Sequence, residues 1–589
     1  MTSDQSTSTP SDEAVIVDSE HPEHSAHHHA GNFSDRERKI AAIVVSLAFV
    51  MDLLDMTIVN VAIPSIQENI GASYAAIQWV IAGYALAFAT ILITGGRLGD
   101  VVGYKKLFLV GIVAFTASSL VCGIASSPGI LIFGRVLQGI GAALMVPQVM
   151  SLIQVMYPPA ERSKVMGIFG ALGGLAASLG PVIGGFLIHW DIAGLSWRPI
   201  FLINIPVGLL ALYAGYRYLP EGRSPHPLKL DLVGTVLVVF ALGLFIYPLI
   251  QGREHGWPWW GFVMLAASAP LFVVFWRWQK KKDALDGSPL VVPALFKVKT
   301  YARGLSMNVI FQFVLIGAGL ATTLTLQVGF GYSVIKAALT GLPAAIGIGL
   351  SIAVLAPKLT PILGRYVVTL GAVIMSIGIG ITALVVNHLG ADTQPWHLLP
   401  GILLNGVGTG LIMGLIFAVT LADVDTAHAG SASGTLNAFD QAGAAVGIAL
   451  VGILFFGALA ANASASFNTA EPKIRESLIT AHVPSQFHDV MINGIRRCYT
   501  DRAKENDASV LPQSCKDLEI QSASAQGSAD TNLSSAWFQE TTTRSLQIAN
   551  GRNFAHAYVL VSVYSIGIAL VCLLLGLLLP RRIEFKTEH

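Results

Sequence analysis

The chain has 589 residues, of which 53% are hydrophobic and only 12% are charged. Soluble domains carry about 25% charged residues, so this composition excludes an ordinary soluble protein and indicates an integral membrane protein. The formal net charge of +1 gives no electrostatic reason to expect a nucleic-acid partner.

Residues 1–39 are polar, and we expect them to form a disordered cytoplasmic tail without a cleavable signal peptide. The tail includes the histidine-rich stretch HPEHSAHHHAG at 21–31. Histidine clusters can bind metal, but this spacing specifies no ligand geometry, so a disordered tail is favoured over a metal site.

Fourteen apolar runs follow, each of roughly the 20 residues that a helix needs to cross a bilayer. They are 40–64, 75–96, 107–126, 129–153, 165–189, 199–219, 231–251, 259–277, 304–328, 337–356, 366–387, 397–421, 433–460 and 553–579. The predicted fold class is therefore an all-α integral membrane protein with 14 transmembrane helices.

Two of these runs repeat one pattern. RVLQGIGAALMVPQVMSLI (135–153) and ILLNGVGTGLIMGLIFAVT (402–420) align without a gap and place glycine on glycine and an amide on an amide. The same register continues into the next run of each half. The chain is thus predicted to contain two similar halves, which is the usual architecture of a secondary transporter.

The repeat divides the chain into two six-helix bundles with two inserted helices between them. The predicted domains are the N-terminal bundle 40–219, the inserted helices with a cytoplasmic connector 220–303, the C-terminal bundle 304–579 with a long extracytoplasmic loop 461–552, and a cytoplasmic tail 580–589.

Lys and Arg are concentrated in every second connecting segment, including 277–303. The positive-inside rule places these segments and both termini in the cytoplasm, with the protein in the inner membrane. The loop 461–552 is then outside. It holds Cys498 and Cys515, which we predict to form a disulfide because that compartment is oxidising.

Ionisable residues inside membrane helices are rare and usually functional. Asp52 and Asp55 share one helix face, and a rise of 1.5 Å per residue places Asp55 and Arg135 about 8–9 Å from the outer edge of the bilayer core. We predict that these three residues face a central cavity and form a proton-coupling centre. A fixed structural ion pair is the alternative, and Asp52 could instead meet a cationic substrate.

Asp440 lies about 11 Å from the cytoplasmic side of its run and is predicted to bind cations or a second proton. The alternative is a polar residue beside the cytoplasmic vestibule. Other polar or aromatic side chains could line a substrate cavity, although each is individually more typical of helix packing. They are Trp79, Tyr84, Gln148 and Asn405, with Gln78, Asn308, Gln312 and Gln327.

Five motifs occur in order along the first half. They are LLDMTIVNVAIPSIQ (53–67), GGRLGDVVGYKK (95–106), LIFGRVLQGIGAALMVPQ (131–148), GALGGLAASLGPVIGGFL (170–187) and SWRPIFLINIPVG (196–208). With these motifs the chain resembles the major facilitator superfamily, in particular the 14-helix EmrB/QacA-type drug:proton antiporters. The resemblance implies a major facilitator fold.

The resemblance also implies residues that gate the cavity. The 95–106 motif contributes Gly96, Asp100, Gly103 and Lys105, and Asp100 is expected to latch onto the N-terminus of the 433–460 helix. Val101 and Tyr104 stand where relatives commonly have Arg. The 170–187 motif contributes Gly180, Pro181, Gly184 and Gly185, which favour close helix packing with consequences for gating.

The function expected from these features is proton-coupled export of small amphipathic or drug-like compounds, working as a monomer in the bilayer, with accessory envelope proteins as possible partners. No ATP-binding or hydrolase motif occurs in the sequence, so we expect no enzyme activity, metal or cofactor, and a proton gradient as the energy source. The alternatives are a dedicated exporter of one metabolite, such as a siderophore or amino acid, and a non-transporting membrane sensor.

Overall fold

The computed structural model describes residues 34–224, 228–425, 429–480, 485–505, 511–518 and 535–578. The histidine-rich stretch 21–31 and the predicted tail 580–589 lie outside these residues. Within the described residues the regular structure is helical, and 13 helices are long and apolar enough to cross a membrane. The remaining predicted run, 165–189, lies within a further helix, so the all-α prediction is confirmed.

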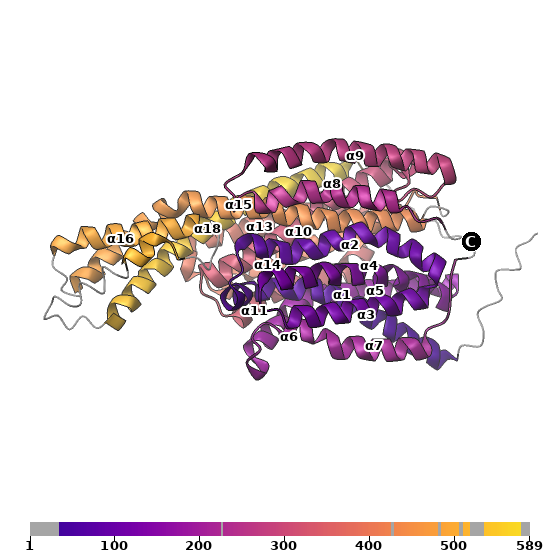
Figure 1. Cartoon of the computed structure of the whole chain (residues 1–589), viewed down its shortest axis with the longest axis horizontal. Helices are drawn as coiled ribbons and strands as arrows, with labels where there is room; N and C mark the ends of the chain where they lie inside the picture. Colours follow the sequence, from indigo (N-terminus) through magenta and orange to yellow (C-terminus); the bar gives the residue numbers. More distant parts are fainter. Residues whose placement is uncertain are drawn as a thin grey trace, which may run out of the picture.

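The N-terminal half is a bundle of helices. Its elements are α1 (Asp35–Ile70), α2 (Tyr74–Val102), α3 (Tyr104–Gly123), α4 (Pro128–Met156), α5 (Pro159–His189), α6 (Pro199–Leu202) and α7 (Asn204–Tyr218). Ser73 and Ser127 begin α2 and α4, because their side chains accept hydrogen bonds from backbone N–H groups of the first turn. α4 packs against α2 and α3, and α1 packs against α5 and α7 (Figure 1).

The C-terminal half repeats this arrangement. Its elements are α10 (Lys299–Leu324), η4 (Thr325–Gly329), α11 (Val334–Leu350), η5 (Ser351–Leu355), α12 (Ala356–Leu363), α13 (Tyr366–Leu389), α14 (Pro395–Leu421), α15 (Ala429–Thr480) and α18 (Ser535–Leu577). α14 packs against α11 and α13 as α4 does against α2 and α3, and α10 packs against α15 as α1 does against α5. The internal repeat read from the sequence is therefore a repeat of structure.

The two halves meet along two helix pairs, α2 with α15 and α5 with α11. Small residues allow the approach: a Cβ atom added to Gly185 would lie 2.8 Å from Ala338 of α11, and one on Gly452 would lie 2.4 Å from the Gln78 side chain of α2. Buried apolar residues of both halves, such as Ile58 and Val451, form one continuous cluster there.

The inserted pair consists of α8 (Leu232–Gln251) and α9 (Trp259–Asp286). α8 lies at the seam between the halves, against α2 and α15, and α9 packs on α8. The connector that follows α9 includes the short helix η3 (Pro293–Lys297), which leads into α10.

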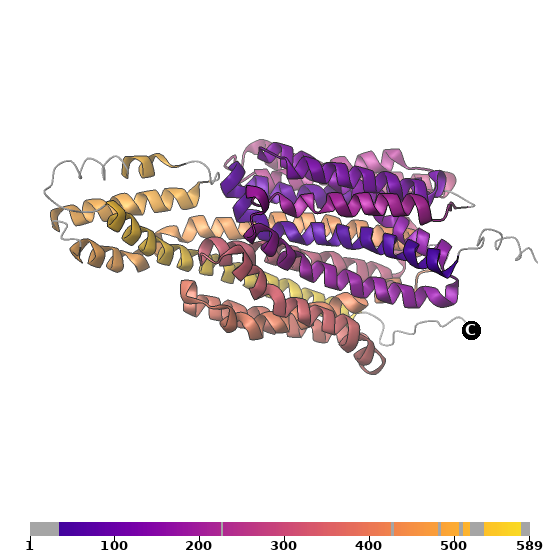
Figure 2. The ribbon, with the colours of Figure 1, turned by 90° about the horizontal axis from the view of Figure 1, so that it is seen from below.

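The segment 461–552 was predicted as a long loop, but the structure differs: its described residues are largely helical. α15 continues to Thr480, α16 (Ser485–Lys504) follows, and α18 begins at Ser535, so that these helices project beyond the bundle (Figures 1 and 2). The physical reason is the pattern Phe467, Ala470, Ile474 and Leu478, which keeps one apolar face on α15 after the membrane run ends. That face packs against α16.

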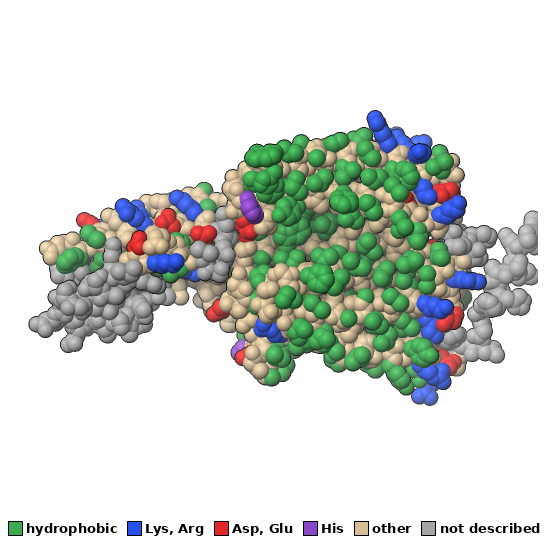
Figure 3. All heavy atoms as spheres, in the orientation of Figure 1, with side chains coloured by type: hydrophobic (Ala, Val, Ile, Leu, Met, Phe, Trp, Pro, Cys, Tyr) green, Lys and Arg blue, Asp and Glu red, His purple; other side chains and the backbone are tan. Residues whose placement is uncertain are grey.

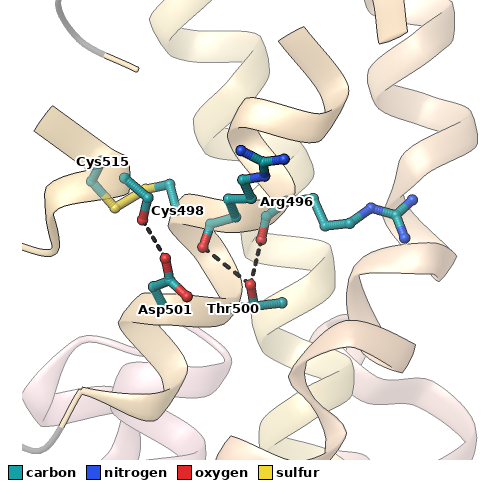
Figure 4. Close-up of a disulfide and its surroundings, with 7 residues drawn as sticks. Arg496, Cys498, Thr500, Asp501 and Cys515 are labelled. Atoms are coloured by element: carbon teal, nitrogen blue, oxygen red, sulfur yellow. Dashed lines mark hydrogen bonds between the residues drawn. A yellow bond between two sulfur atoms is a disulfide. The ribbon is translucent and has the colours of Figure 1, made fainter. Parts of the chain in front are cut away.

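The structure joins Cys498 of α16 to Cys515 by a disulfide, the pair proposed from the sequence (Figure 4). Nearby, Arg496 of α16 forms an ion pair with Glu471 of α15 and donates a hydrogen bond of 2.8 Å to the Asn468 side chain. The extension is thus held by an apolar core, an ion pair and a covalent bond.

Replacing both Cys498 and Cys515 with serine is expected to destabilise this extension by about 3 kcal/mol, because the bond restricts the unfolded chain over a separation of 17 residues. Limited proteolysis should cleave the 461–552 region faster in the variant, whereas serine at the buried Cys122 should leave that region unchanged. The measurement is mass spectrometry, without reduction, of protein isolated from cells with an oxidising envelope. If both thiols are found free, the disulfide prediction is wrong.

Candidate proton-coupling site

The structure brings Asp55 of α1 and Arg135 of α4 into direct contact. Arg135 Nη1 pairs with Asp55 Oδ2, and the two side chains are 1% and 0% exposed. The depth argument from the sequence therefore identified two residues that do meet. They meet inside the N-terminal bundle, because their other hydrogen-bond partners are Val80 of α2, Gln138 of α4 and Asn204 of α7.

Two amides complete the surroundings of Asp55. Gln138 Nε2 and Asn204 Nδ2 donate to Asp55 Oδ1 at 2.7 and 2.9 Å. Gln138 Oε1 accepts from Arg135 Nη1 at 2.8 Å, and the Ser119 hydroxyl accepts from both amides. Asp55 is thus bound by one cation and two neutral donors. A buried carboxylate needs such partners, because it has lost its hydrogen bonds to water.

The second acid, Asp52, has a different environment. Its Oδ1 accepts a hydrogen bond from the hydroxyl of Tyr84. The Tyr84 ring in turn lies under the guanidinium of Arg135, with 4.2 Å between Cζ and the ring centroid. Arg135 Nε donates to the Val80 carbonyl at 3.0 Å. Tyr84 therefore connects the two acids: its hydroxyl bonds Asp52, and its ring stacks on Arg135, which pairs with Asp55.

Local sequence explains why α4 can deliver Arg135 so deep into the bundle. A Cβ atom on Gly139 would lie 2.4 Å from the Tyr84 carbonyl, and one on Gly141 would lie 2.6 Å from the Phe115 nitrogen. Only glycine permits this approach of α4 to α2 and α3. Gln138 is three residues after Arg135 and so shares its helix face, a signal that could have identified it as part of the site. Asn204 lies in the 196–208 motif, and that motif is the signal that could have identified it.

The other predicted cavity residues lie elsewhere. Trp79 donates from Nε1 to Gln251 of the inserted helix α8 at 3.3 Å. Gln148 is fully buried and donates to the Gly95 carbonyl of α2 at 3.0 Å. Asn405 accepts from Thr409 within its own helix, at 3.2 Å. Of Trp79, Tyr84, Gln148 and Asn405, Tyr84 is the one that joins the Asp55 cluster.

Asp100 and Lys105 of the 95–106 motif have partners close to them at the same end of the N-terminal half. Asp100 accepts a hydrogen bond of 3.0 Å from the Tyr104 hydroxyl, and Lys105 pairs with Glu221 at 3.7 Å. Gly103 has φ 108°, a conformation that glycine adopts readily, and separates α2 from α3. Gly96 packs near Pro147. Residues 426–428, just before α15, lie outside the described residues, so the latch expected of Asp100 stays a prediction.

The small residues of α5 are packing positions. A Cβ atom on Gly180 would lie 2.0 Å from the Thr57 hydroxyl of α1, and one on Gly184 would lie 2.7 Å from Ile58. Pro181 lies within a helix that runs without interruption over Pro159–His189. These residues hold α5 against α1, while Gly185 faces the other half.

Sequence patterns did not point to Arg97, although it stands inside the 95–106 motif. It is 5% exposed, and its guanidinium donates to the carbonyls of Ser288 (2.7 Å), Lys229 (3.2 Å) and Pro289. Lys229 precedes α8, and the other two follow α9. Arg97 therefore attaches the inserted pair and its connector to the N-terminal half.

Replacing Arg97 with alanine is expected to lower stability by about 3 kcal/mol, because buried carbonyls lose a charged donor. Thermal unfolding of the purified chain should show the loss, and trypsin should cut the connector more readily. Alanine at the exposed Lys106, close to the same end of α2, provides the matched control. Equal unfolding temperatures for the two variants would contradict the role assigned to Arg97.

Residues 45–448 match the sequence model of the Major Facilitator Superfamily. The chain belongs to this superfamily. A probable actinorhodin transporter of Streptomyces coelicolor is 39% identical over 548 residues, which span 92% of each chain. A puromycin resistance protein of Streptomyces alboniger is 34% identical over 434 residues, covering 72% of this chain and 84% of the relative.

Comparison with a solved structure supports the same fold. The crystal structure of a bacterial homologue of the human lysosomal transporter Spinster matches with a TM-score of 0.53 at 18% identity, covering 92% of this chain and 98% of the other. The predicted major facilitator superfamily fold is confirmed, and the chain is a multi-pass membrane protein.

Proposed function

We propose that this protein is a proton-coupled exporter of small amphipathic, drug-like compounds across the cytoplasmic membrane. The observation that carries the proposal is the buried Asp55–Arg135 pair at membrane depth. Ionisable groups placed there are expensive and mark ion pathways. Relatives named for the transport of actinorhodin and for resistance to puromycin support export as the direction.

In the proposed cycle, Asp55 takes a proton from outside and releases it inside. Burial disfavours an ionised carboxylate, whereas Arg135 and the amides of Gln138 and Asn204 favour it. Rocking of the two halves changes the access of water to the pair, so the balance shifts between the two faces. Asp52 and Tyr84 extend the same network and provide a second acceptor for a proton.

The surface supports the proposed orientation. Hydrophobic side chains cover the body of the bundle, whereas Lys and Arg gather at the end of the bundle opposite the helical extension (Figures 1 and 3). By the positive-inside rule this end is cytoplasmic. The helical extension at the opposite end is then outside, where its disulfide is chemically expected.

A second candidate function is dedicated export of a single compound. It is favoured by the probable actinorhodin transporter, which is similar over 92% of its length and whose name specifies one compound. A panel of substrates separates the two candidates, because a dedicated exporter should move one chemical family only.

The proposal is tested with the full chain in proteoliposomes that carry an imposed pH gradient. Puromycin, ethidium and a neutral anthraquinone serve as probes, and a pH-sensitive dye reports proton movement. Uphill transport of a probe with opposite proton flux is expected, and it should stop when a protonophore collapses the gradient. Probe binding without any flux would favour the membrane sensor, and transport that ignores the gradient would overturn proton coupling.

A further inference from the structure

The Ser119 hydroxyl of α3 is shared by the two amides that bind Asp55. The side-chain nitrogen of Gln138 on α4 donates to Ser119 Oγ at 2.8 Å, and that of Asn204 on α7 donates to it at 3.3 Å. Both nitrogens also donate to Asp55 Oδ1. An amide NH₂ group has two hydrogens, so each amide can give one to Asp55 and one to Ser119. Four side chains from α1, α3, α4 and α7 therefore close a ring of hydrogen bonds.

The single hydrogen of the Ser119 hydroxyl is already used. Ser119 Oγ donates to the Phe115 carbonyl, one turn earlier on α3, at 2.8 Å. Its oxygen therefore accepts from the amides and does not donate to them, and an ionised Asp55 is likewise an acceptor only. The partners of an amide decide which way it is oriented. These two acceptors thus orient Gln138 and Asn204 with nitrogen, and not oxygen, toward Asp55.

The two amides differ in how firmly they are oriented. Gln138 Oε1 accepts from Arg135 Nη1 at 2.8 Å, so turning this amide would place its NH₂ group against the guanidinium. The described hydrogen bonds of the Asn204 side chain are those to Asp55 and Ser119. Asn204 is therefore the amide whose orientation depends on Ser119.

Protonation of Asp55 makes this arrangement unfavourable. Oδ2 faces Arg135 and Oδ1 faces two N–H donors, so a proton on either oxygen meets a donor and not an acceptor. Turning the oxygen of Asn204 toward Asp55 would supply an acceptor. The same turn would point that oxygen at Ser119, which would then have to give up its bond to the Phe115 carbonyl. Ser119 thus opposes the turn and leaves displacement of Asn204 as the alternative.

Asn204 lies at a point where its helix can move. It is the first residue of α7, and Ile203 separates it from α6. Pro206 has no N–H to donate to the carbonyl of Leu202, four residues before it, and the junction lacks that helical hydrogen bond. Because α7 packs against α1 and α3, displacement of Asn204 is transmitted to both helices.

We propose that Ser119 is a positioning residue for the proton carrier. Its hydroxyl keeps Asn204 oriented as a donor, and this orientation links protonation of Asp55 to displacement of α7. The inference rests on the proposed proton-coupled function, because it concerns the step in which Asp55 takes up a proton. Ser119 does not carry the proton itself and acts through the two amides.

Other ionisable groups around Asp55 are left in place by a substitution at Ser119. They are Arg135 of α4, Asp52 of α1, Tyr84 of α2 and Cys122 of α3, whose sulfur lies 3.8 Å from Gln138 Oε1. Residues 165–188 of α5 and 204–216 of α7 contain no Asp, Glu, Lys or Arg. Asp440, the other acid predicted within the membrane, is 5% exposed on α15 of the C-terminal half.

The proposal is tested by infrared titration of the full chain in lipid nanodiscs, without a gradient or a substrate. The band of the protonated Asp55 carboxyl is identified by its absence in Asp55→Asn. Ser119→Ala removes the acceptor that orients Asn204, so the amide can turn and accept from a protonated Asp55. The midpoint of the titration should therefore move to higher pH, by about half to one unit for the loss of one hydrogen bond. Ser119→Cys, which offers only a weak acceptor, should move it in the same direction.

Ser118→Ala is the matched control. Ser118 is also buried, and its hydroxyl donates within α3 to the Ala114 and Phe115 carbonyls, so the midpoint should not change. Ser119→Thr retains a hydroxyl and should keep the native midpoint. In an Asn204→Ala background, Ser119→Ala should produce a smaller shift, because the amide that turns is absent.

A native midpoint in both Ser119→Ala and Ser119→Cys, an equal shift in Ser118→Ala, or an undiminished shift in the Asn204→Ala background would each overturn the proposal. Absence of the Asp55 band at every pH in the native chain would overturn Asp55 as the proton carrier, and this inference with it. That failure of the proposed function is distinct from a band whose midpoint does not respond to Ser119.

Discussion

Replacing Asp55 with asparagine is expected to reduce proton-driven export to background, while the protein still reaches the membrane and folds. An amide cannot gain or lose a proton in this pH range, so the coupling step is lost. Substrate binding should survive, since the amide resembles the protonated acid in size and polarity. Uptake of a fluorescent cation into inverted vesicles under an imposed pH gradient measures the effect.

Asp392→Asn is the control for this variant, since it makes the same chemical change at an exposed position. Asp52→Asn gives a second comparison, because Asp52 is hydrogen-bonded to Tyr84 and forms no ion pair with Arg135 among the described contacts. If Asp55→Asn still moves substrate uphill on a proton gradient, Asp55 is not the carrier, and Asp52 or Asp440 must take that role.

Replacing Arg135 with alanine is expected to have two effects. The chain should lose about 3–5 kcal/mol of stability, because the substitution leaves a buried carboxylate without its cation. Transport should fall at neutral pH, because desolvation then favours the protonated acid and proton release becomes limiting. Raising the pH on the releasing side should partly restore it. Thermal unfolding and a pH–rate profile measure the two effects separately.

The double variant Asp55→Asn, Arg135→Ala distinguishes the contribution of the ion pair to stability from that of side-chain packing. If the ion pair matters as a pair, the double variant should be more stable than Arg135→Ala alone, because the unpaired charge is gone. Strictly additive losses of stability would show that Arg135 acts mainly by filling space. Recovery of transport at high pH in the double variant would contradict the assignment of Asp55.

The fold could largely be predicted from hydropathy and from the internal repeat. Each apolar run is long enough to require a helix in a bilayer, where backbone groups have no other partners. The pairing of Gln138 with Asn405 and of Gly139 with Gly406 in one register revealed that α4 and α14 are equivalent. The helical extension at 461–552 was missed, because its helices are amphipathic and carry many charges. Their mean hydropathy is therefore as low as that of a polar loop.

The residues of the candidate site could be predicted from the sequence in part. Helical rise placed Asp55 and Arg135 at one depth, and their contact followed from it. Ser119 could not be predicted, because it comes from another helix whose rotation about its own axis the sequence does not specify. For the same reason the sequence did not show that Trp79 hydrogen-bonds Gln251 of α8 and that Gln148 hydrogen-bonds the Gly95 carbonyl of α2.

The sequence by itself thus determined the membrane class, the two halves, the family and the matching depths of Asp55 and Arg135, because these depend on the length and order of apolar segments. Only the tertiary structure decided which of the buried acids pairs with a cation. Asp55 and Asp440 are both carboxylates within apolar helices, yet Asp55 pairs with Arg135, whereas no ion pair of Asp440 is seen among the described residues. That difference depends on helix rotation and close packing at glycines, which only the folded chain defines.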